Sequence, residues 1–207
     1  MNKSRIEKVI IQSKSLNKEM SMLVYLPGGY DEGETFPTLY FMHGRSGNEN
    51  FMTHIDLNVV SDRLIEANRI RPMIIVCPNM DNSRGINSSL DCKEVLDPLN
   101  RTINIGMYED YFINEVIPEI DKRYKTIKNR DGRYIGGASA GGYIALHNAF
   151  RHADMFSKIG GHMPAVELQL EDEDKAYFRH QGDWEKYDPI TIAKEMTCTD
   201  FKVYLDA

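Results

Sequence analysis

The sequence has few cysteines, little tryptophan and no long apolar run. Its 207 residues include one tryptophan and three cysteines, Cys77, Cys92 and Cys198. These cysteines are odd in number and widely spaced, without a C-x-x-C pair, which argues against a disulfide framework and against a zinc site. No stretch approaches the roughly 20 apolar residues that span a membrane, and the charged N-terminus has no apolar signal-peptide region. We therefore expect no membrane association and a reducing, cytoplasmic location.

The charge balance is acidic and the composition is that of an ordinary globular protein. The formal net charge at pH 7 is −6, with 42% hydrophobic and 27% charged residues. An acidic chain has no general attraction to phosphate backbones or anionic lipid, so nucleic acid is not an expected partner. The length is enough to bury a substantial core. We expect one domain over residues 1–207, and the sequence leaves the oligomeric state open, homo-oligomers included.

Short apolar runs alternate with segments of helical spacing. Runs at 5–11 and 19–26 flank a polar turn and predict an antiparallel hairpin. The later patterns predict strands at 38–42, 73–77, 133–136, 158–161 and 201–205, and helices at 50–67, 109–124, 143–150 and 189–196. Continuous apolar strands separated by helices indicate an α/β fold with a mostly parallel sheet covered on both faces. We expect 79–105 to be irregular and 165–188 to be an insertion or lid.

Two of the predicted helices carry a specific expectation. Pro118 should kink or interrupt the 109–124 helix, because proline lacks a backbone N–H. The 50–67 helix should bury one face, since its apolar residues share a side at helical spacing; these are Met52, Ile55, Val59, Val60 and Leu64.

Residues 137–141 carry the clearest functional pattern. Gly137-Ala138-Ser139-Ala140-Gly141 fits G-x-S-x-G, in which a strand turns sharply into a helix and presents a nucleophilic serine. The backbone at such a serine is strained, so its neighbours two positions away must be small. An apolar strand precedes the pattern and a helical run follows it. This setting favours a catalytic Ser139 over an incidental serine in a Gly/Ala-rich turn.

The predicted strands bring further polar residues to the same edge of the sheet. Five positions fall at the carboxyl ends of strands, where ligands of such sheets bind: His43-Gly44, Pro78-Asn79, Ser139, His162 and Asp206. Attack by a serine creates an oxyanion that needs preorganised N–H donors. The backbone N–H of Ala140 should be one donor. We expect the second from the glycine-containing loop that follows residue 42, at Arg45.

Five segments span nearly the whole chain: Val24-Tyr25-Leu26-Pro27 with Gly29-Tyr30, 39–47, 115–121 with Tyr124, 137–141 and 203–207. In content and order they resemble the putative-esterase family of α/β-hydrolases, which includes esterase D, feruloyl and acetylxylan esterases and the antigen 85 acyltransferases. The family usually has methionine after the nucleophile, where this chain has Ala140. That change leaves the backbone donor in place.

The resemblance implies the fold, the reaction and part of the site. It implies an α/β-hydrolase three-layer sandwich and hydrolysis of a small-molecule ester through an acyl-enzyme on Ser139, with no metal or organic cofactor. His43 resembles the family's oxyanion-loop histidine, which shapes the loop. We expect His43, Ser46 and His162 to line the substrate site.

The resemblance also indicates what the chain lacks. In this fold the acid and then the histidine follow the serine, and in the family both come after a strand that resembles 203–206. Asp206 therefore resembles the first aspartate of a D-x-G turn. We expect the catalytic acid and histidine beyond residue 207, together with a final strand and helix, and little turnover by residues 1–207 alone. Asp206 acting with an unusual histidine is the less favoured account.

Other readings stay open at this point. An acyltransferase of the same fold would use an acceptor other than water, and a non-catalytic homologue would keep the pocket only.

The acidic run Glu171-Asp172-Glu173-Asp174 lacks the spacing of a calcium loop and is expected to be a solvated face. The nearby aromatic residues either line an acyl or aryl pocket or pack the insertion; they are Tyr177, Phe178, Trp184 and Tyr187.

Overall fold

A computed structural model describes residues 3–32, 34–178, 180–197 and 200–207. Its main sheet has seven strands in the order β1-β2-β4-β3-β7-β8-β9. They are β1 (Arg5–Ser13), β2 (Lys18–Leu26), β3 (Thr38–Met42), β4 (Ile74–Pro78), β7 (Arg133–Ala138), β8 (Lys158–His162) and β9 (Lys202–Asp206). Each predicted strand is therefore present, most of them one or two residues longer than the apolar run.

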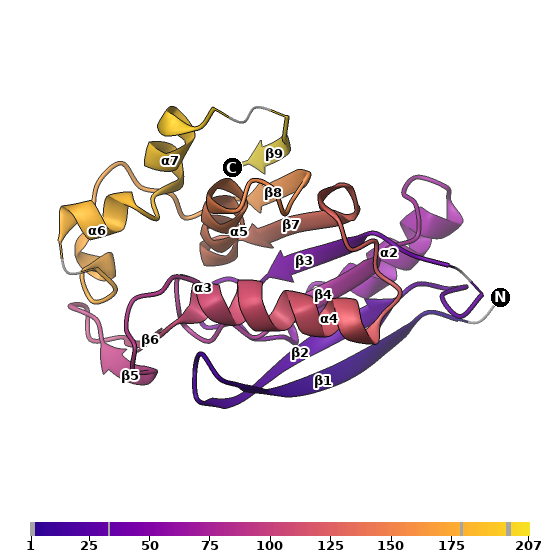
Figure 1. Cartoon of the computed structure of the whole chain (residues 1–207), viewed down its shortest axis with the longest axis horizontal. Helices are drawn as coiled ribbons and strands as arrows, with labels where there is room; N and C mark the ends of the chain where they lie inside the picture. The colour runs from indigo at the N-terminus through magenta and orange to yellow at the C-terminus, as the bar shows by residue number, and fades with distance from the viewer. Residues whose placement is uncertain (1–2, 33, 179, 198–199) are drawn as a thin grey trace.

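The sheet combines an antiparallel entry edge with a parallel remainder. β1 pairs with β2 and β2 with β4 in antiparallel fashion, whereas β4, β3, β7, β8 and β9 pair in parallel. The arrowheads of β3, β7 and β8 consequently point to the same edge (Figure 1). Five strands that run in one direction bring their carboxyl ends together, as the sequence predicted.

Helices cover both faces of the sheet, which makes three layers. On one face lie α1 (Phe51–His54) and α2 (Leu57–Glu66), whose apolar residues pack against β2 and β4. The other face carries α5 (Ala140–Arg151) and a continuous helical stretch made of α3 (Tyr108–Asp110), the π-helix η1 (Tyr111–Val116) and α4 (Ile117–Arg123). α7 (Pro189–Glu195) packs on α5.

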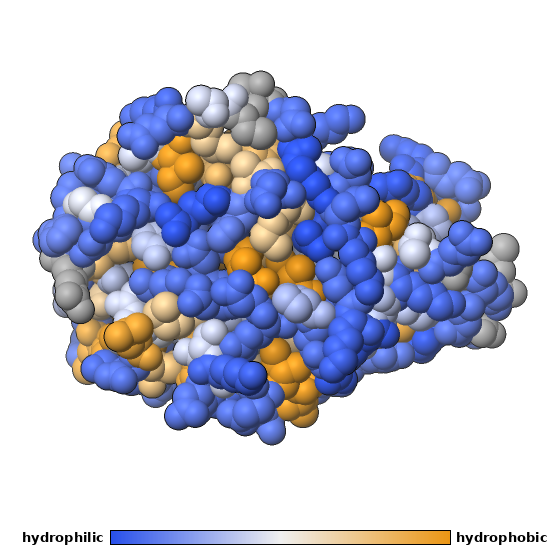
Figure 2. Space-filling view, in the orientation of Figure 1, coloured by the Kyte–Doolittle hydropathy of each residue, from blue (hydrophilic) through white to orange (hydrophobic). Residues whose placement is uncertain are grey.

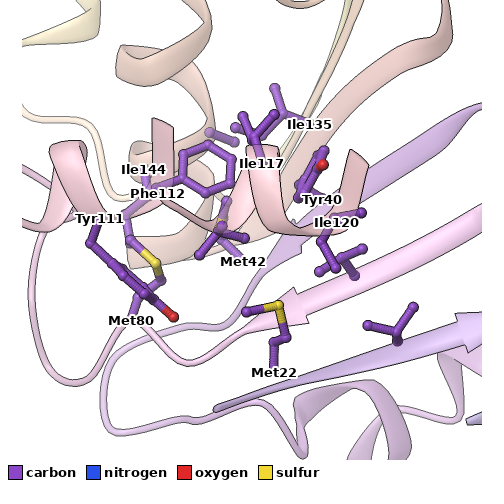
Figure 3. Close-up of a cluster of buried hydrophobic side chains, with 14 of the residues drawn as sticks. Met22, Tyr40, Met42, Met80, Tyr111, Phe112, Ile117, Ile120, Ile135 and Ile144 are labelled. Carbon is purple, nitrogen blue, oxygen red and sulfur yellow. The ribbon is translucent and has the colours of Figure 1, made fainter. Parts of the chain in front are cut away.

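The larger core lies between the sheet and the α3–η1–α4 stretch. Figure 3 shows Met22, Tyr40 and Met42 of the sheet facing Phe112, Ile117 and Ile120 of the helices. All six side chains are buried. Tyr40 and Phe112 meet edge to face, with ring centroids 5.5 Å apart. This packing fixes β3, whose end positions the loop that precedes α1.

The 50–67 segment differs from the prediction of one helix with a buried face. Asp56 adopts φ 53° and separates α1 from α2. Met52 is fully buried, but Ile55, Val59 and Val60 are 42%, 37% and 44% exposed. The left-handed residue changes the phase between the two helices, so one apolar stripe cannot serve both. The predicted common face was wrong.

Pro118 lies where the hydrogen-bond register of the 109–124 helix changes, and it does not end the helix. The preceding turns, 111–116, are π-helical, and Pro118 lies in the first turn of α4. A proline is tolerated there because its missing N–H falls where the regular hydrogen-bond register changes. The helical direction continues through the proline.

The 79–105 stretch is less irregular than predicted. It contains a hairpin of β5 (Lys93–Leu96) and β6 (Thr102–Ile105). This hairpin and α6 (Gln181–Glu185) lie beyond the carboxyl edge of the main sheet (Figure 1). Segment 165–188 also contains the short 3₁₀ helix η3 (Asp172–Asp174).

The surface is mostly hydrophilic, with apolar areas between α7 and β9 (Figure 2). A cavity of about 400 Å³ lies there, lined by residues that include Phe150, Ile190 and Leu205. None of the described helices is long and apolar enough to cross a bilayer. Cys77 is buried, as the apolar run around it predicted, and Cys198 lies outside the described residues.

Candidate active site

Ser139 lies on a sharp turn between β7 and α5. Its backbone has φ 54° and ψ −120°, a conformation that costs a non-glycine residue free energy. Its N–H donates to the carbonyl of His162 at 2.9 Å, and its carbonyl accepts from the N–H of Ala165 at 3.0 Å. These bonds hold the strained residue in place. The Ser139 side chain is at the exposed edge of the sheet, although the strand before it is buried.

The small residues around Ser139 are required by close backbone contacts. A Cβ on Gly137 would lie 2.4 Å from the carbonyl oxygen of Gly141, and a Cβ on Gly141 would lie 2.2 Å from that of Met42. Neither position can hold a side chain unless the backbone moves. The G-x-S-x-G pattern therefore reflects how tightly β3, β7 and α5 approach one another.

The loop that follows β3 (residues 43–47, the glycine loop) lies beside Ser139. β3 pairs in parallel with β7, with Met42 opposite Gly137, so the residues after each strand emerge together. A Cβ built on Gly44 would lie 3.6 Å from the Cβ of Ser139. Within the described part of the chain, the backbone N–H groups of Arg45 and Ala140 have no hydrogen-bond partner. Ser46 has φ 60°, and its N–H donates to Asn82 Oδ1 at 3.3 Å.

His43 is buried at the base of this loop, at 2% exposure. Its Nε2 accepts from the backbone N–H of Met80 at 3.0 Å, and its Nδ1 lies 2.8 Å from the carbonyl of Gly44. These partners assign the proton to Nδ1 and leave the ring neutral. Burial lowers the pKa of His43 and stabilises that neutral form. Nε2 thus joins the loop to Met80, and Nδ1 holds the loop residue Gly44.

His162 and Asp206 form a pair two strands across from the loop. The sheet register places Ala138, His162 and Asp206 side by side at the ends of β7, β8 and β9. His162 Nδ1 lies 2.6 Å from Asp206 Oδ1, and the His162 side chain is 55% exposed. Desolvation opposes ionisation of Asp206, but its interactions with His162, Tyr204 and the Met163 N–H together outweigh desolvation and lower the pKa of that carboxyl.

The remaining histidines have other partners. His147 is fully buried with Nε2 3.1 Å from the carbonyl of Arg84, and burial lowers its pKa to about 4. His152 lies 2.8 Å from Glu109. His54 ends α1, and His180 caps α6. In the described ranges, no side chain forms a hydrogen bond with Ser139 Oγ.

An ion cluster connects segment 165–188 to the loops around the site. The Arg84 guanidinium, 1% exposed, makes three bonds of 2.6–2.9 Å to Asp174, whose side chain is 2% exposed. Glu167 and Glu173 each lie 3.4 Å from Arg84. Burial, with the nearby Asp174, raises the pKa of Glu167 to about 7. The predicted solvated acidic face was therefore wrong for Asp174, because a buried arginine pairs with it.

The aromatic residues of the segment pack it against the core. Tyr177, Phe178 and Trp184 are buried in one cluster with Tyr143 of α5. Tyr177 also donates to the carbonyl of Asn82 at 2.7 Å. A cavity of about 340 Å³ between the segment and residues 86–90 is lined by the rings of Tyr177, Phe178 and Tyr187.

Comparison with known proteins identifies the family of this chain. A sequence model described as "Putative esterase" matches residues 13–207. The chain belongs to the putative esterase family. Relatives include an endo-1,4-beta-xylanase/feruloyl esterase of Xylanibacter ruminicola, 28% identical over 77% of this chain, and esterase Rv1288 of Mycobacterium tuberculosis, 26% identical over 76%. The chain spans only 22% and 32% of the lengths of these two relatives.

The fold of the family is also found among solved structures. An S-formylglutathione hydrolase from Agrobacterium tumefaciens superposes with a TM-score of 0.78 at 18% identity, covering 98% of this chain and 75% of that one. The seven-stranded, mostly parallel sheet is thus that of an α/β-hydrolase.

The sequence patterns did not identify the residues from other segments that hold the loop after β3. Asn82, Arg84 and Glu173 contact the loop or its neighbours, yet they come from segments about 90 residues apart. No local motif marks any of them. The only signal was an arginine in a polar stretch and an acidic run elsewhere, and a sequence alone does not pair the two.

Proposed function

We propose that this protein hydrolyses carboxylic esters through an acyl-enzyme on Ser139. The observation that carries the proposal is the backbone of Ser139 at φ 54°, on the turn from β7 to α5 and beside the glycine loop after β3. This geometry exposes the hydroxyl at the edge where the parallel strands end. Membership of the putative esterase family supports the same reaction.

The proposed steps use Ser139, two backbone N–H donors beside it and a base. The Ser139 oxygen attacks the ester carbonyl carbon, its proton passes to a base, and the carbonyl oxygen becomes an oxyanion. The backbone N–H groups of Arg45 and Ala140 donate to that oxyanion, and each such donor contributes about 3 kcal/mol to the transition state. The C–O bond then breaks, the alcohol leaves with a proton, and water hydrolyses the acyl-serine.

His43 and His162 have different proposed roles. The two hydrogen bonds of the buried His43 support a role in shaping the loop, in place of the direct substrate contact expected for it. The exposed His162 is proposed to contact substrate, as is Ser46. For the base, the resemblance implies a histidine and an acid that follow residue 207, and we keep that assignment as a proposal.

A His162→Gln variant discriminates between the two origins of the base. A base placed elsewhere predicts that kcat for p-nitrophenyl acetate changes less than about tenfold. Loss of a general base costs about 10²- to 10⁴-fold. A decrease of that size in His162→Gln would assign the base to His162 and its partner Asp206.

The reaction itself is tested by p-nitrophenyl acetate hydrolysis with Ser139→Ala, in a parent protein that includes the segment after residue 207 proposed to carry the acid and histidine. Ser157→Ala is the matched control, because Ser157 lies just before β8, at the opposite end of the sheet from Ser139. The proposal expects turnover that Ser139→Ala abolishes and Ser157→Ala retains. Equal rates in the parent protein and in Ser139→Ala would refute it.

The class of substrate is proposed as a small-molecule ester. The relatives' names include a feruloyl esterase and an S-formylglutathione hydrolase, so aryl esters and thioesters are the first compounds to compare. A cytoplasmic location, the absence of nucleic-acid partners and the oligomeric state stay predictions.

A further inference from the structure

Arg45 is held by its side chain. Its guanidinium Nη2 lies 3.1 Å from Glu173 Oε1, and Nη1 lies 3.5 Å from Oε2. Both side chains are partly buried, at 25% and 29% exposure. Since the Arg45 backbone N–H has no partner among the described residues, this ion pair is the polar contact that fixes the residue.

The loop around Arg45 has little rigidity of its own. Gly44 and Gly47 flank Arg45 and Ser46, and one backbone hydrogen bond of 3.1 Å, from Gly47 to Gly44, closes the turn. Glycine leaves more backbone conformations accessible than any other residue. A contact that restrains Arg45 from outside therefore has a large effect on where its N–H points.

Glu173 is itself held from three directions. Besides Arg45 of the loop, it accepts from Arg101 of the β5–β6 hairpin at 3.1 Å and from the buried Arg84 at 3.4 Å. The next residue, Asp174, makes the buried ion pair with Arg84. A single exposed ion pair contributes little, but a network on a buried arginine fixes its members more firmly.

Segment 165–188 and the loop after β3 are also connected through Asn82. Tyr177 of segment 165–188 donates to the Asn82 carbonyl, and the Asn82 side chain accepts from the Ser46 N–H. The segment thus contacts the loop directly at Arg45 and reaches the Ser46 N–H through Asn82. Its position and the geometry of the loop are coupled.

We propose that Glu173 is a positioning residue of the active site. Its carboxylate holds the Arg45 side chain and thereby orients the Arg45 backbone N–H toward the oxyanion that forms on attack by Ser139. This inference rests on the proposed esterase function. It gives segment 165–188 a part in catalysis that involves no contact with the reacting atoms.

The first test measures the loop directly, without reference to activity. Hydrogen exchange of the peptide covering residues 43–50 should be faster in Glu173→Gln than in the parent protein. Asp172→Asn is the matched control, because Asp172 lies in the same turn but is 73% exposed and pairs with Lys175. Unchanged exchange of this peptide in Glu173→Gln overturns the inference.

The second test separates positioning from simple support of the fold. Glu173→Gln and Arg45→Met should each lower kcat for p-nitrophenyl acetate by about 10- to 100-fold, with KM within about threefold, since misplacing a catalytic group mainly affects the transition state. The double variant should lose no more than either single variant. Additive losses, or wild-type kcat in Glu173→Gln, contradict the inference.

Two comparisons separate failure of the positioning role of Glu173 from failure of the proposed esterase function. Arg101→Met removes another partner of Glu173 without touching the loop, so it should retain kcat. If the parent protein has no Ser139-dependent turnover, the proposed function fails at that step. The exchange comparison would still decide whether Glu173 restrains residues 43–47.

Discussion

The Nε2 atom of His43 accepts a hydrogen bond of 3.0 Å from the backbone N–H of Met80. Met80 follows β4 and His43 follows β3, so the imidazole joins the ends of two neighbouring strands. A buried histidine at this place fixes the direction in which the glycine loop leaves the sheet.

Replacing His43 should therefore affect both stability and catalysis. His43→Ala leaves the buried Met80 N–H without a partner, which costs about 1–3 kcal/mol of unfolding free energy. The loosened loop should also lower kcat for p-nitrophenyl acetate by about tenfold or more. Urea unfolding and steady-state kinetics measure the two effects. His54→Ala, at an exposed helix end, should change neither, and a fully active His43→Ala would contradict this role.

Adding one methyl group at Gly141 should be strongly destabilising. Its Cβ would meet two backbone oxygens, of Met42 at 2.2 Å and of His43 at 2.6 Å, and backbone cannot move aside cheaply. We expect Gly141→Ala to lose about 3 kcal/mol or more. Gly160→Ala is the matched control, because the nearest atom to its Cβ is 4.0 Å away. Equal unfolding midpoints for the two variants would show that the tight packing is not required.

Removing the charge of Asp174 from its buried ion pair with Arg84 should strongly lower the stability of the fold. Asp174→Asn leaves a guanidinium that is 1% exposed without its main counter-charge. Breaking such a pair from one side costs about 3–5 kcal/mol. Asp172→Asn, two residues away and exposed, should leave the thermal midpoint unchanged. A similar midpoint for both variants would contradict the account of the cluster.

Glu167 predicts a pH dependence of stability. Its folded pKa of about 7 is above the ordinary 4.5, so the folded protein keeps a proton that the unfolded chain releases. Burial and the negative charges of Asp174 and Glu173 disfavour the Glu167 carboxylate, whereas the positive charge of Arg84 favours it. Stability is consequently lost as pH rises from about 4.5 through about 7.

A glutamine at position 167 imitates the protonated acid. Glu167→Gln should raise the thermal midpoint relative to the parent protein near pH 8 and should change it little near pH 5. The comparison is made by calorimetry in matched buffers. An equal shift at both pH values would mean that the carboxyl does not titrate in this range.

The sequence predicted the sheet and the position of Ser139 because both depend on local patterns. A continuous apolar run such as 73–77 identifies a buried strand without any other residue being known. G-x-S-x-G identifies the strained turn because only small residues fit around its serine. The β5–β6 hairpin was missed because its strand 93–96 is short and mostly exposed. Exposed strands lack the apolar run that marks a buried one.

The environment of the loop depends on contacts that no local pattern records. Arg84 and Asp174 are 90 positions apart, and each looks like an ordinary surface residue in its own segment. The left-handed Asp56 likewise divides a stretch whose spacing is helical throughout. Tertiary packing decided both cases, and only the folded chain shows it.

The central claim is that Ser139 carries the acyl group, and trapping that group tests it most directly. The protein is mixed with p-nitrophenyl acetate, quenched in acid and digested, and the peptide containing residues 134–151 is analysed by mass spectrometry. The account predicts one acetyl group on Ser139, formed together with p-nitrophenolate and absent in Ser139→Ala. Ester hydrolysis at an undiminished rate by Ser139→Ala, with no acetyl group on this peptide in the parent protein, would contradict it.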